Sequence, residues 1–351
     1  SQKIIVQNDS VLFGKLNPRV EKVWHVQSES GYKKIASTEF IPIYPDQKKI
    51  FPRYLYYVEW SKFVMPKAKT LVTGSTPSRQ RVDPTSFFKI KIPLPPRIEQ
   101  VRIAFILSNL QQIIDQQEKI IVKTKELKRS LMHRLFTYGL RGEELKETEI
   151  CMMPDSWKLV SVGEVYEFTT KPRGLDISKY KEVPFIPMEL ISENQRLLHK
   201  YEMRKSFSSG TYVQKGDLVI AKITPSFENG KQGIVTDIPL DFCYATTEVW
   251  PLHGIDGQSN IEYLHYYLKK PDVRNKIAGK MEGSTGRQRV PKNVLSDAKI
   301  PLPSYREQVE ISNIFTSLDE KIDATESKKI SLQNLFKSML QLLMTGQVRV
   351  K

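Results

Sequence analysis

Two stretches of the chain repeat apolar residues every seven positions and contain neither proline nor glycine. They run from Arg97 to Tyr138 and from Ser304 to Thr345. Apolar residues at this spacing, flanked by charges, are typical of a long helix that packs along another helix. At a rise of 1.5 Å per residue, each helix would be about 60 Å long. Gly139 and Gly346 are predicted to end them.

Neither helix can bury its apolar stripe alone, so we expect the two to pack on each other as an antiparallel coiled coil. The residues predicted to form this packing are Ile103, Ile106, Leu110, Ile113, Ile120, Leu127 and Leu131 in the first helix, and Ile311, Ile314, Leu318, Leu332, Leu335, Met339 and Leu342 in the second.

The stretches before the two helices have a different pattern, typical of short strands and short helices. In the second of them, a β-prone run covers residues 213–223, and strand-like runs follow at 231–237 and 243–252. Between these runs, Asn229 and Gly230 predict a tight turn, because both tolerate positive φ. Residues 261–270 and 271–280 predict two short helices, the second with Pro271 in its first turn. The pattern as a whole predicts an α+β fold.

The chain also repeats its own sequence at an offset of 207–209 residues. The matching pairs, in chain order, are NDSVLFGKLNP (8–18) with GDLVIAKITP (216–225), ASTEFIP (36–42) with ATTEVWP (245–251), YLYYV (54–58) with YLHYY (263–267), GSTPSRQRV (74–82) with GSTGRQRV (283–290), and IPLPPRIEQV (92–101) with IPLPSYREQV (300–309). A period this long indicates a duplicated domain rather than a solenoid.

The repeat divides the chain into two related globular domains, each followed by a long helix. The expected parts are domain 1 at 1–96, helix 1 at 97–139, a polar linker at 140–152, domain 2 at 153–303 and helix 2 at 304–346. The segment PDSWKLVSVGEV (154–165) opens domain 2 and has no counterpart in domain 1. Subtracting the offset places that counterpart upstream of Ser1, so we expect domain 1 to lack its N-terminal part.

Charge narrows the choice of partner. The 351 residues include 54 Lys and Arg against 39 Asp and Glu, a net charge of +15, and the pI is near 9.5. Such a surplus favours a polyanion such as nucleic acid. No apolar run is long enough to cross a membrane. The only cysteines are Cys151 and Cys243, so we expect no disulfide framework and a reducing, cytoplasmic location.

Two related basic domains held by long helices suit a DNA target of two halves. Duplex DNA presents equivalent groove faces about every 34 Å, so a pseudo-two-fold protein can read two half-sites separated by a spacer. The helices would then act as a ruler, and a change in their length should change the spacer rather than the bases that are read.

The duplicated IPLP…EQ start of each long helix, the GST…RQRV segment before it, GDLVIAKITP and PDSWKLVSVGEV carry a family resemblance over essentially the whole chain. The chain resembles the specificity subunit of type I restriction-modification systems. The resemblance implies two target recognition domains that bind double-stranded DNA, and spacer helices that dock two modification subunits. These partners would carry S-adenosylmethionine and methylate adenine, and a restriction subunit that uses ATP could join them. The resemblance also implies that this chain is not catalytic and binds no cofactor itself.

Candidate DNA contacts fall into repeated and single-copy groups. The repeated ones are Lys15, Arg79, Gln80 and Arg81 with their counterparts Lys222, Arg287, Gln288 and Arg289. Repeated residues favour phosphate anchoring, or contact with a partner subunit, over base reading, because two domains that read different bases should differ where they read. For Lys15 and Lys222, a solvated lysine on a structural turn is as good an interpretation as a phosphate contact. Lys205 and Lys231 occur in one copy only, which suits base reading but also describes an ordinary surface.

For three other sets of residues we prefer a structural role to a functional one. Glu39 and Glu248 recur in a Thr-Glu step, where a structural hydrogen bond is favoured over catalysis. The tyrosine groups at 54–57 and 263–267 could stack on bases, but core packing is favoured for helices. The histidines, which are His25, His133, His199, His253 and His265, lack metal-ligand spacing with either cysteine, so no metal site is predicted.

Two other kinds of function stay open at this point. The chain could be a DNA nuclease or methyltransferase with a site that these patterns do not reveal. It could also be a coiled-coil protein whose helices mainly bind other proteins. It lacks an Asn/Asp-Pro-Pro-aromatic motif for a flipped adenine and a GxxxxGK[ST] loop for ATP, which argues against encoded methyl transfer and ATP-driven translocation.

Overall fold

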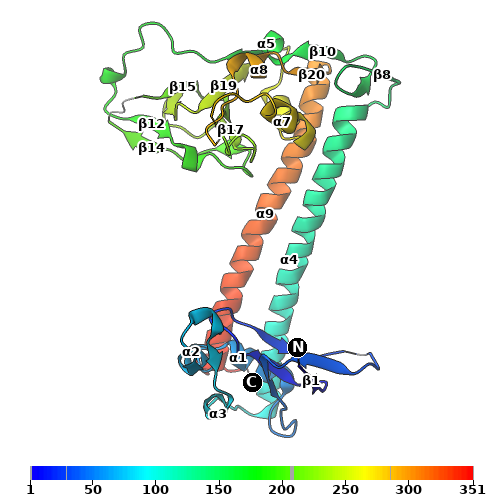
Figure 1. The fold of residues 1–351 in the computed structure, drawn as a ribbon, viewed down its shortest axis with the longest axis vertical. Helices are drawn as coiled ribbons and strands as arrows, with labels where there is room; N and C mark the ends of the chain where they lie inside the picture. Colours follow the sequence, from blue (N-terminus) through cyan, green and yellow to red (C-terminus); the bar gives the residue numbers. More distant parts are fainter. Residues whose placement is uncertain (1, 29, 206–208, 285, 351) are drawn as a thin grey trace. The chain divides into compact units, whose positions relative to one another are not determined.

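The computed structural model describes residues 2–28, 30–205, 209–284 and 286–350, and the chain divides into two compact units (Figure 1). Unit 1 comprises Ser1–Ile121 and Ala324–Lys351, and unit 2 comprises Val122–Asp323. The helices α4 (Arg97–Tyr138) and α9 (Tyr305–Met344) each contribute one part to each unit. Both predicted long helices are confirmed to within two residues at each end, and Gly139 and Gly346 follow them with positive φ.

Unit 1 has a small antiparallel sheet in the order β3-β2-β5, an antiparallel pair β1-β4, a short pair β6-β7, and short helices. The bounds are β1 Lys3–Val6, β2 Val11–Gly14, β3 Val23–His25, β4 Lys34–Ser37, β5 Phe40–Ile43, α1 Pro52–Trp60, α2 Met65–Thr70, β6 Val72–Thr73, η1 Pro77–Arg79, β7 Arg81–Val82 and α3 Pro84–Phe87. Its core joins Phe13, Ile41, Tyr57 and Phe87 to the two long helices.

Unit 2 is larger. It has a five-stranded sheet in the order β11-β19-β16-β17-β13, a four-stranded sheet β14-β12-β18-β15, and the pairs β10-β20 and β8-β9. The strands are β8 Leu145–Glu147, β9 Met152–Pro154, β10 Lys158–Ser161, β11 Tyr166–Phe168, β12 Val183–Ile186, β13 Leu197–Leu198, β14 Glu202–Arg204, β15 Thr211–Gln214, β16 Leu218–Ala221, β17 Gln232–Val235, β18 Phe242–Ala245, β19 Val249–Gly254 and β20 Lys299–Leu302. The helices are α5 Val162–Val165, η2 Ile177–Lys179, η3 Met188–Leu190, α6 Ile261–Tyr267, α7 Pro271–Ala278 and α8 Lys292–Ser296.

The α+β prediction and the two short helices are confirmed, but two strand predictions merged separate strands. The run 213–223 contains the end of β15 and the whole of β16, divided by a turn in which Gly216 has φ 95°. The run 243–252 contains most of β18 and the start of β19. Continuous apolarity marks burial on both faces, so the pattern alone could not show where the chain turns.

The internal repeat holds at the level of strand register. In unit 1, Leu12 of β2 lies opposite Pro42 of β5, and in unit 2 Val219 of β16 lies opposite Pro251 of β19. The pair β1-β4 likewise has the same register as β15-β18, with Ile5 opposite Ile35 and their counterparts Tyr212 and Tyr244 opposite each other. The two units are therefore copies of one fold around a shared set of strands.

The long helices pack on each other inside each unit. In unit 1, Ile103 and Leu107 near the start of α4 share a core with Leu340 and Leu343 near the end of α9. In unit 2, Leu135 and Phe136 near the end of α4 share a core with Ile311 and Phe315 near the start of α9. The two helices therefore run antiparallel within each unit, as predicted, while a coiled-coil supercoil stays a prediction.

The predicted helix-packing residues are half right. Ile103 and Ile311 are fully buried, and Leu110, Leu131, Leu318, Leu332 and Met339 are half-buried, but Ile120, Leu127 and Leu335 are 39%, 50% and 47% exposed. The second row of seam residues lies one position after the row that was predicted. Its members are Leu107, Ile114, Ile121 and Leu135 in α4 and Phe315, Ile322, Phe336 and Leu343 in α9. The remaining predicted positions, Ile106, Ile113, Ile314 and Leu342, are half-buried beside this seam.

The error has a simple cause. A heptad can alternate steps of three and four residues in either order, and apolar pairs such as Ile113–Ile114 and Ile120–Ile121 fit both orders. The prediction took the step of three first, whereas the structure takes the step of four first.

Candidate nucleic-acid interface

The repeated basic residues lie together at the end of one strand in each unit. In unit 1, β2 ends at Gly14, and the GST…RQRV loop folds back on the residues after it. Val82 N donates to Lys15 O at 3.0 Å, and Asn17 N donates to Gln80 O at 2.8 Å. We call this arrangement of the strand end and the returning loop the basic clasp. It brings Lys15, Gln80 and Arg81 into one small region.

Unit 2 has the same basic clasp after β16. Val290 N donates to Lys222 O at 2.8 Å, and Thr224 N donates to Gln288 O at 3.0 Å. The loop begins with a glycine in the left-handed region in both copies, since Gly74 has φ 110° and Gly283 has φ 128°. At Gly283 a Cβ would lie 2.9 Å from Arg287 O, so a side chain there would open the loop. The repeat of the sequence motif is thus explained by a repeated backbone structure.

An ion pair fixes one arginine of each clasp. In unit 1, Arg81 Nη2 lies 2.9 Å from Glu39 Oε1, and in unit 2 Arg289 Nη2 lies 2.7 Å from Glu248 Oε1. Each arginine also donates through Nε to the same carboxylate, so the contact is bidentate. These hydrogen bonds hold the pKa of Glu39 and of Glu248 below the usual range. The two glutamates therefore have the structural role that the sequence favoured.

The other repeated candidates differ in solvent exposure and in their contacts. Arg79 and Arg287 are exposed, and Gln80 and Gln288 are half-buried. Lys222 lies with Nζ 4.1 Å from the centre of the Trp250 ring, and burial lowers its pKa. Lys15 is half-buried at the equivalent place. Half of each Arg81 and Arg289 side chain stays exposed, so every clasp presents positive charge to solvent even where a carboxylate matches it.

The two single-copy candidates flank strands of different sheets in unit 2. Lys231, just before β17, donates from Nζ to Met188 O at 3.2 Å and is half-buried. Lys205 directly follows β14 and is exposed. Contact of any of these residues with DNA stays a prediction.

The tyrosine groups belong to the core. Tyr54, Tyr57, Tyr263 and Tyr266 are at most 1% exposed, which leaves no ring face for a base. The hydroxyls of Tyr54 and Tyr263 instead donate to backbone carbonyls just before the long helices. Tyr54 Oη donates to Pro93 O at 3.1 Å, and its counterpart Tyr263 donates to Pro301 O at 2.7 Å.

A glutamine near the start of each long helix anchors the helix to its globular part, and the sequence analysis missed this role. In unit 2, Gln308 Oε1 accepts from Asn260 N at 2.8 Å, and Gln308 Nε2 donates to Gln258 O and Pro303 O, each at 3.0 Å. In unit 1, Gln100 Oε1 accepts from Phe51 N at 2.8 Å, and Nε2 donates to Lys49 O and Pro95 O. The repeated Glu-Gln step after IPLP was the signal that could have revealed it.

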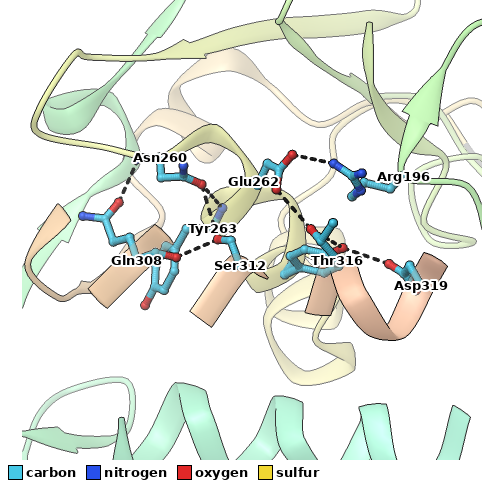
Figure 2. Close-up of polar contacts among 9 residues, drawn as sticks. Arg196, Asn260, Glu262, Tyr263, Gln308, Ser312, Thr316 and Asp319 are labelled. Atoms are coloured by element: carbon cyan, nitrogen blue, oxygen red, sulfur yellow. Dashed lines mark hydrogen bonds and ion pairs between the residues drawn. The ribbon is translucent and has the colours of Figure 1, made fainter. Parts of the chain in front are cut away.

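Figure 2 shows how this anchor continues along α9 in unit 2. Asn260 and Glu262 of the α6 region point toward the helix, where Ser312 donates to Asn260 at 3.3 Å and Thr316 donates to Glu262 at 3.1 Å. Glu262 also pairs with Arg196. A chain of polar contacts therefore fixes the globular part of unit 2 on its segment of α9.

Metal chemistry finds no support in the described residues, where no three His, Cys, Asp or Glu side chains gather as possible ligands. His265 is buried against Gln232, and burial lowers its pKa well below the ordinary value. Within the same described ranges, no helix is long and apolar enough to cross a membrane.

Comparison with known proteins decides the family. The family model of the type I restriction modification DNA specificity domain matches residues 2–126 and 154–334. The chain belongs to this family. It is 28% identical over 338 residues to the type I restriction enzyme MjaVIII specificity subunit of Methanocaldococcus jannaschii, which covers 92% of this chain and 76% of that protein. It is 31% identical over 207 residues to the EcoAI specificity subunit of Escherichia coli, covering 58% of this chain and 34% of that protein.

Solved structures agree on the fold. The S subunit of a type I restriction-modification system from M. genitalium matches with a TM-score of 0.58 at 15% identity, covering 98% of this chain and 84% of that one. The subunit from Thermoanaerobacter tengcongensis matches with a TM-score of 0.50 at 18% identity, covering 98% and 82%.

The chain is therefore a DNA sequence-specificity subunit of a type I restriction-modification system, and catalysis belongs to other subunits of such enzymes. The comparisons do not favour the nuclease, methyltransferase or purely structural alternatives.

Proposed function

We propose that this specificity subunit reads a DNA target of two halves, one half with each unit, and that its long helices form a coiled coil that sets the distance between the halves. The observation that carries the proposal is the repeat itself. Both units present a basic clasp on the same strand register and both anchor a long helix through the same glutamine. Two copies of one reading fold suit two half-sites on a duplex.

The clasps and the variable loops have different parts in this proposal. The repeated clasp residues contact phosphates and set the position of each unit on the duplex, because their identity in both copies carries no sequence information. The bases are read by residues that differ between the units. Among the candidates, Lys205 and Lys231 belong to this second group.

The partners complete the activity. The helices dock two modification subunits, which carry S-adenosylmethionine and methylate adenine in the target, and restriction subunits that use ATP can join. This chain contributes the choice of sequence and binds neither cofactor. The net charge of +15 suits the DNA partner.

Reconstitution with the modification subunits tests the proposal. The complex should methylate adenine in one split motif, and neither the chain alone nor the modification subunits alone should do so. Equal methylation of that motif without this chain would refute the proposal. Binding of the complex to the motif should weaken steeply as salt rises, because phosphate contacts release counterions.

A further inference from the structure

The connection between β16 and β17 in unit 2 differs from its counterpart in unit 1, although the strands that it joins have the same register. It follows a proline that both copies share, Pro225 in unit 2 and Pro18 in unit 1. From that proline to the next strand there are six residues in unit 2 (226–231) and four in unit 1 (19–22). The chain therefore varies directly beside the clasp, which is itself repeated.

The longer connection forms a closed turn against the clasp. Thr224 Oγ1 accepts from Gln288 N of the returning loop at 2.9 Å, and Asn229 N donates back to Pro225 O at 2.9 Å. Glu228 and Asn229 lie at the end of this turn, and both are exposed. We call these two residues the tip. The hydrogen bonds keep the tip beside the repeated basic residues.

Two cations hold the backbone on either side of the tip. Arg274, which is 5% exposed, donates from Nη1 to Phe227 O at 2.8 Å, and Lys269 donates from Nζ to Gly230 O at 3.0 Å. The Phe227 ring is 1% exposed and lies 4.6 Å from the Arg274 guanidinium. The backbone of the tip is therefore fixed from below, while its side chains face solvent.

The turn does not account for the side chains of the tip. The sequence predicted a tight turn from Asn229 and Gly230 together, but only Gly230 has a positive φ, of 80°. Within the described residues, neither Glu228 nor Asn229 makes a side-chain hydrogen bond or ion pair. A carboxylate and an amide are thus presented in a fixed position with their hydrogen-bonding groups available to a ligand.

Unit 1 has neither the longer connection nor its supports. At the offset of the repeated tyrosine motif, Met65 takes the place of Arg274 and Trp60 takes the place of Lys269. The exposed residues 19–20 of the shorter connection are an arginine and a valine. The two units therefore present different side chains at the same place beside the same clasp, as two readers of different sequences should.

We propose that Glu228 and Asn229 read base edges in the half-site of unit 2, and that Arg274 is the positioning residue of this tip. The proposal rests on the proposed function, in which unit 2 reads one half of the target. An asparagine amide pairs with adenine through two hydrogen bonds in the major groove, and a glutamate carboxylate accepts from the amino group of cytosine. Because the turn is already ordered, little conformational freedom is lost when it binds.

Methylation by the reconstituted complex tests the tip. Rates would be measured on duplexes in which each base pair of the split motif is replaced in turn, with the half read by unit 2 identified by exchange of residues 154–303. Asn229→Ala should lower the discrimination at one A·T pair of that half by roughly tenfold to a hundredfold. Glu228→Gln should do the same at a neighbouring C·G pair. Asn229→Asp keeps the shape but loses the donor, so it should shift the preference at its pair from adenine toward cytosine.

A second set of variants tests the role of Arg274. Arg274→Met places the unit 1 residue under the tip, so discrimination should fall at the same base pairs and hydrogen exchange should become faster in residues 228–231. The salt dependence of binding should stay as it was, because the clasp is intact. Arg274→Lys keeps one charged donor and should recover part of the discrimination.

The matched control is Asp256→Asn. Asp256 is exposed beyond the end of β19, whereas the clasp lies at the other end of this strand, where Val249 pairs with Ala221. This variant should change the preference at no position. Unchanged preferences in all the tip variants, in a complex that still methylates its split motif, would overturn the tip assignment and leave the proposed function standing. A uniform loss over both halves would also overturn it, because phosphate contacts or stability would then be the cause.

Discussion

At equivalent positions, unit 1 contacts the long helices through an apolar side chain and unit 2 through a charged pair. In unit 1, the Tyr57 ring lies 6.1 Å from the Phe336 ring of α9, and its hydroxyl donates to Ser108 at 3.0 Å. In unit 2, Lys128 of α4 takes the place of Phe336. Its Nζ lies 5.1 Å from the centre of the Tyr266 ring and pairs with Asp319, which also accepts from Tyr266 Oη at 2.9 Å.

The two units differ at both of these positions. Asp319 of the charged site corresponds to Gln111 in unit 1, and Lys128 corresponds to Phe336. A half-buried ammonium needs a carboxylate, whereas an apolar ring does not. A repeat can therefore exchange a polar contact for an apolar one while the helices keep their place.

A second contrast between the units, at Glu59, gives the largest expected effect on stability. Glu59 in α1 is 3% exposed, and burial raises its pKa to about 8, whereas its counterpart Leu268 is apolar and 1% exposed. The folded unit therefore holds a proton that the unfolded chain releases near pH 4.5. Stability from this group is complete below that pH and falls by up to about 1.4 kcal/mol per pH unit as pH rises toward 8.

Glu59→Leu should remove this dependence. We expect the variant to be more stable than the parent by about 4 kcal/mol at pH 8 and close to it at pH 4.5. Urea unfolding of unit 1 at both values measures the difference, and Leu268→Ile in unit 2 is the control. Parallel pH curves for the variant and the parent would contradict the buried-proton account.

The charged site of unit 2 gives the next effect. Lys128→Phe leaves Asp319 without its ammonium at a site where the two side chains are 21% and 15% exposed, so we expect a loss of about 2 kcal/mol. Adding Asp319→Gln reproduces the pair found in unit 1 and should restore most of that loss. A double variant as unstable as the single one, in thermal unfolding of unit 2, would show that the two positions are not coupled.

The clasp arginines give the smallest effect, which is on DNA binding rather than stability. Arg287 is exposed, and in the described chain no carboxylate lies within ion-pair distance of it, whereas Arg289 is matched by Glu248. Arg287→Ala should lower the slope of log affinity against log salt by about one, and Arg289→Ala by less. Titration of the reconstituted complex with its target at several salt concentrations measures both slopes. Equal slopes for the two variants would show that the ion pair with Glu248 does not weaken the contribution of Arg289 to DNA binding.

Sequence reasoning reached the architecture because its signals were long or repeated. Forty-two residues without proline or glycine define each helix, and five ordered matches define the repeat. It missed the phase of the helix seam, because neighbouring isoleucines satisfy both orders of the heptad. It also missed the partners of Arg81 and Arg289, since a pair such as Arg81–Glu39 joins residues far apart in the chain that only the fold brings together. The anchoring role of Gln100 and Gln308 depends on backbone carbonyls, which leave no mark on composition.

Exchange of the recognition fold of unit 2 tests the central claim most directly. Residues 154–303 would be replaced by the matching segment of a related specificity subunit with a known target, and methylated adenines would be mapped across the genome of a host that also expresses the modification subunits. The account predicts that one half of the split motif changes and that the other half stays as it was. A map in which both halves change, or neither does, would contradict the assignment of one half-site to each unit.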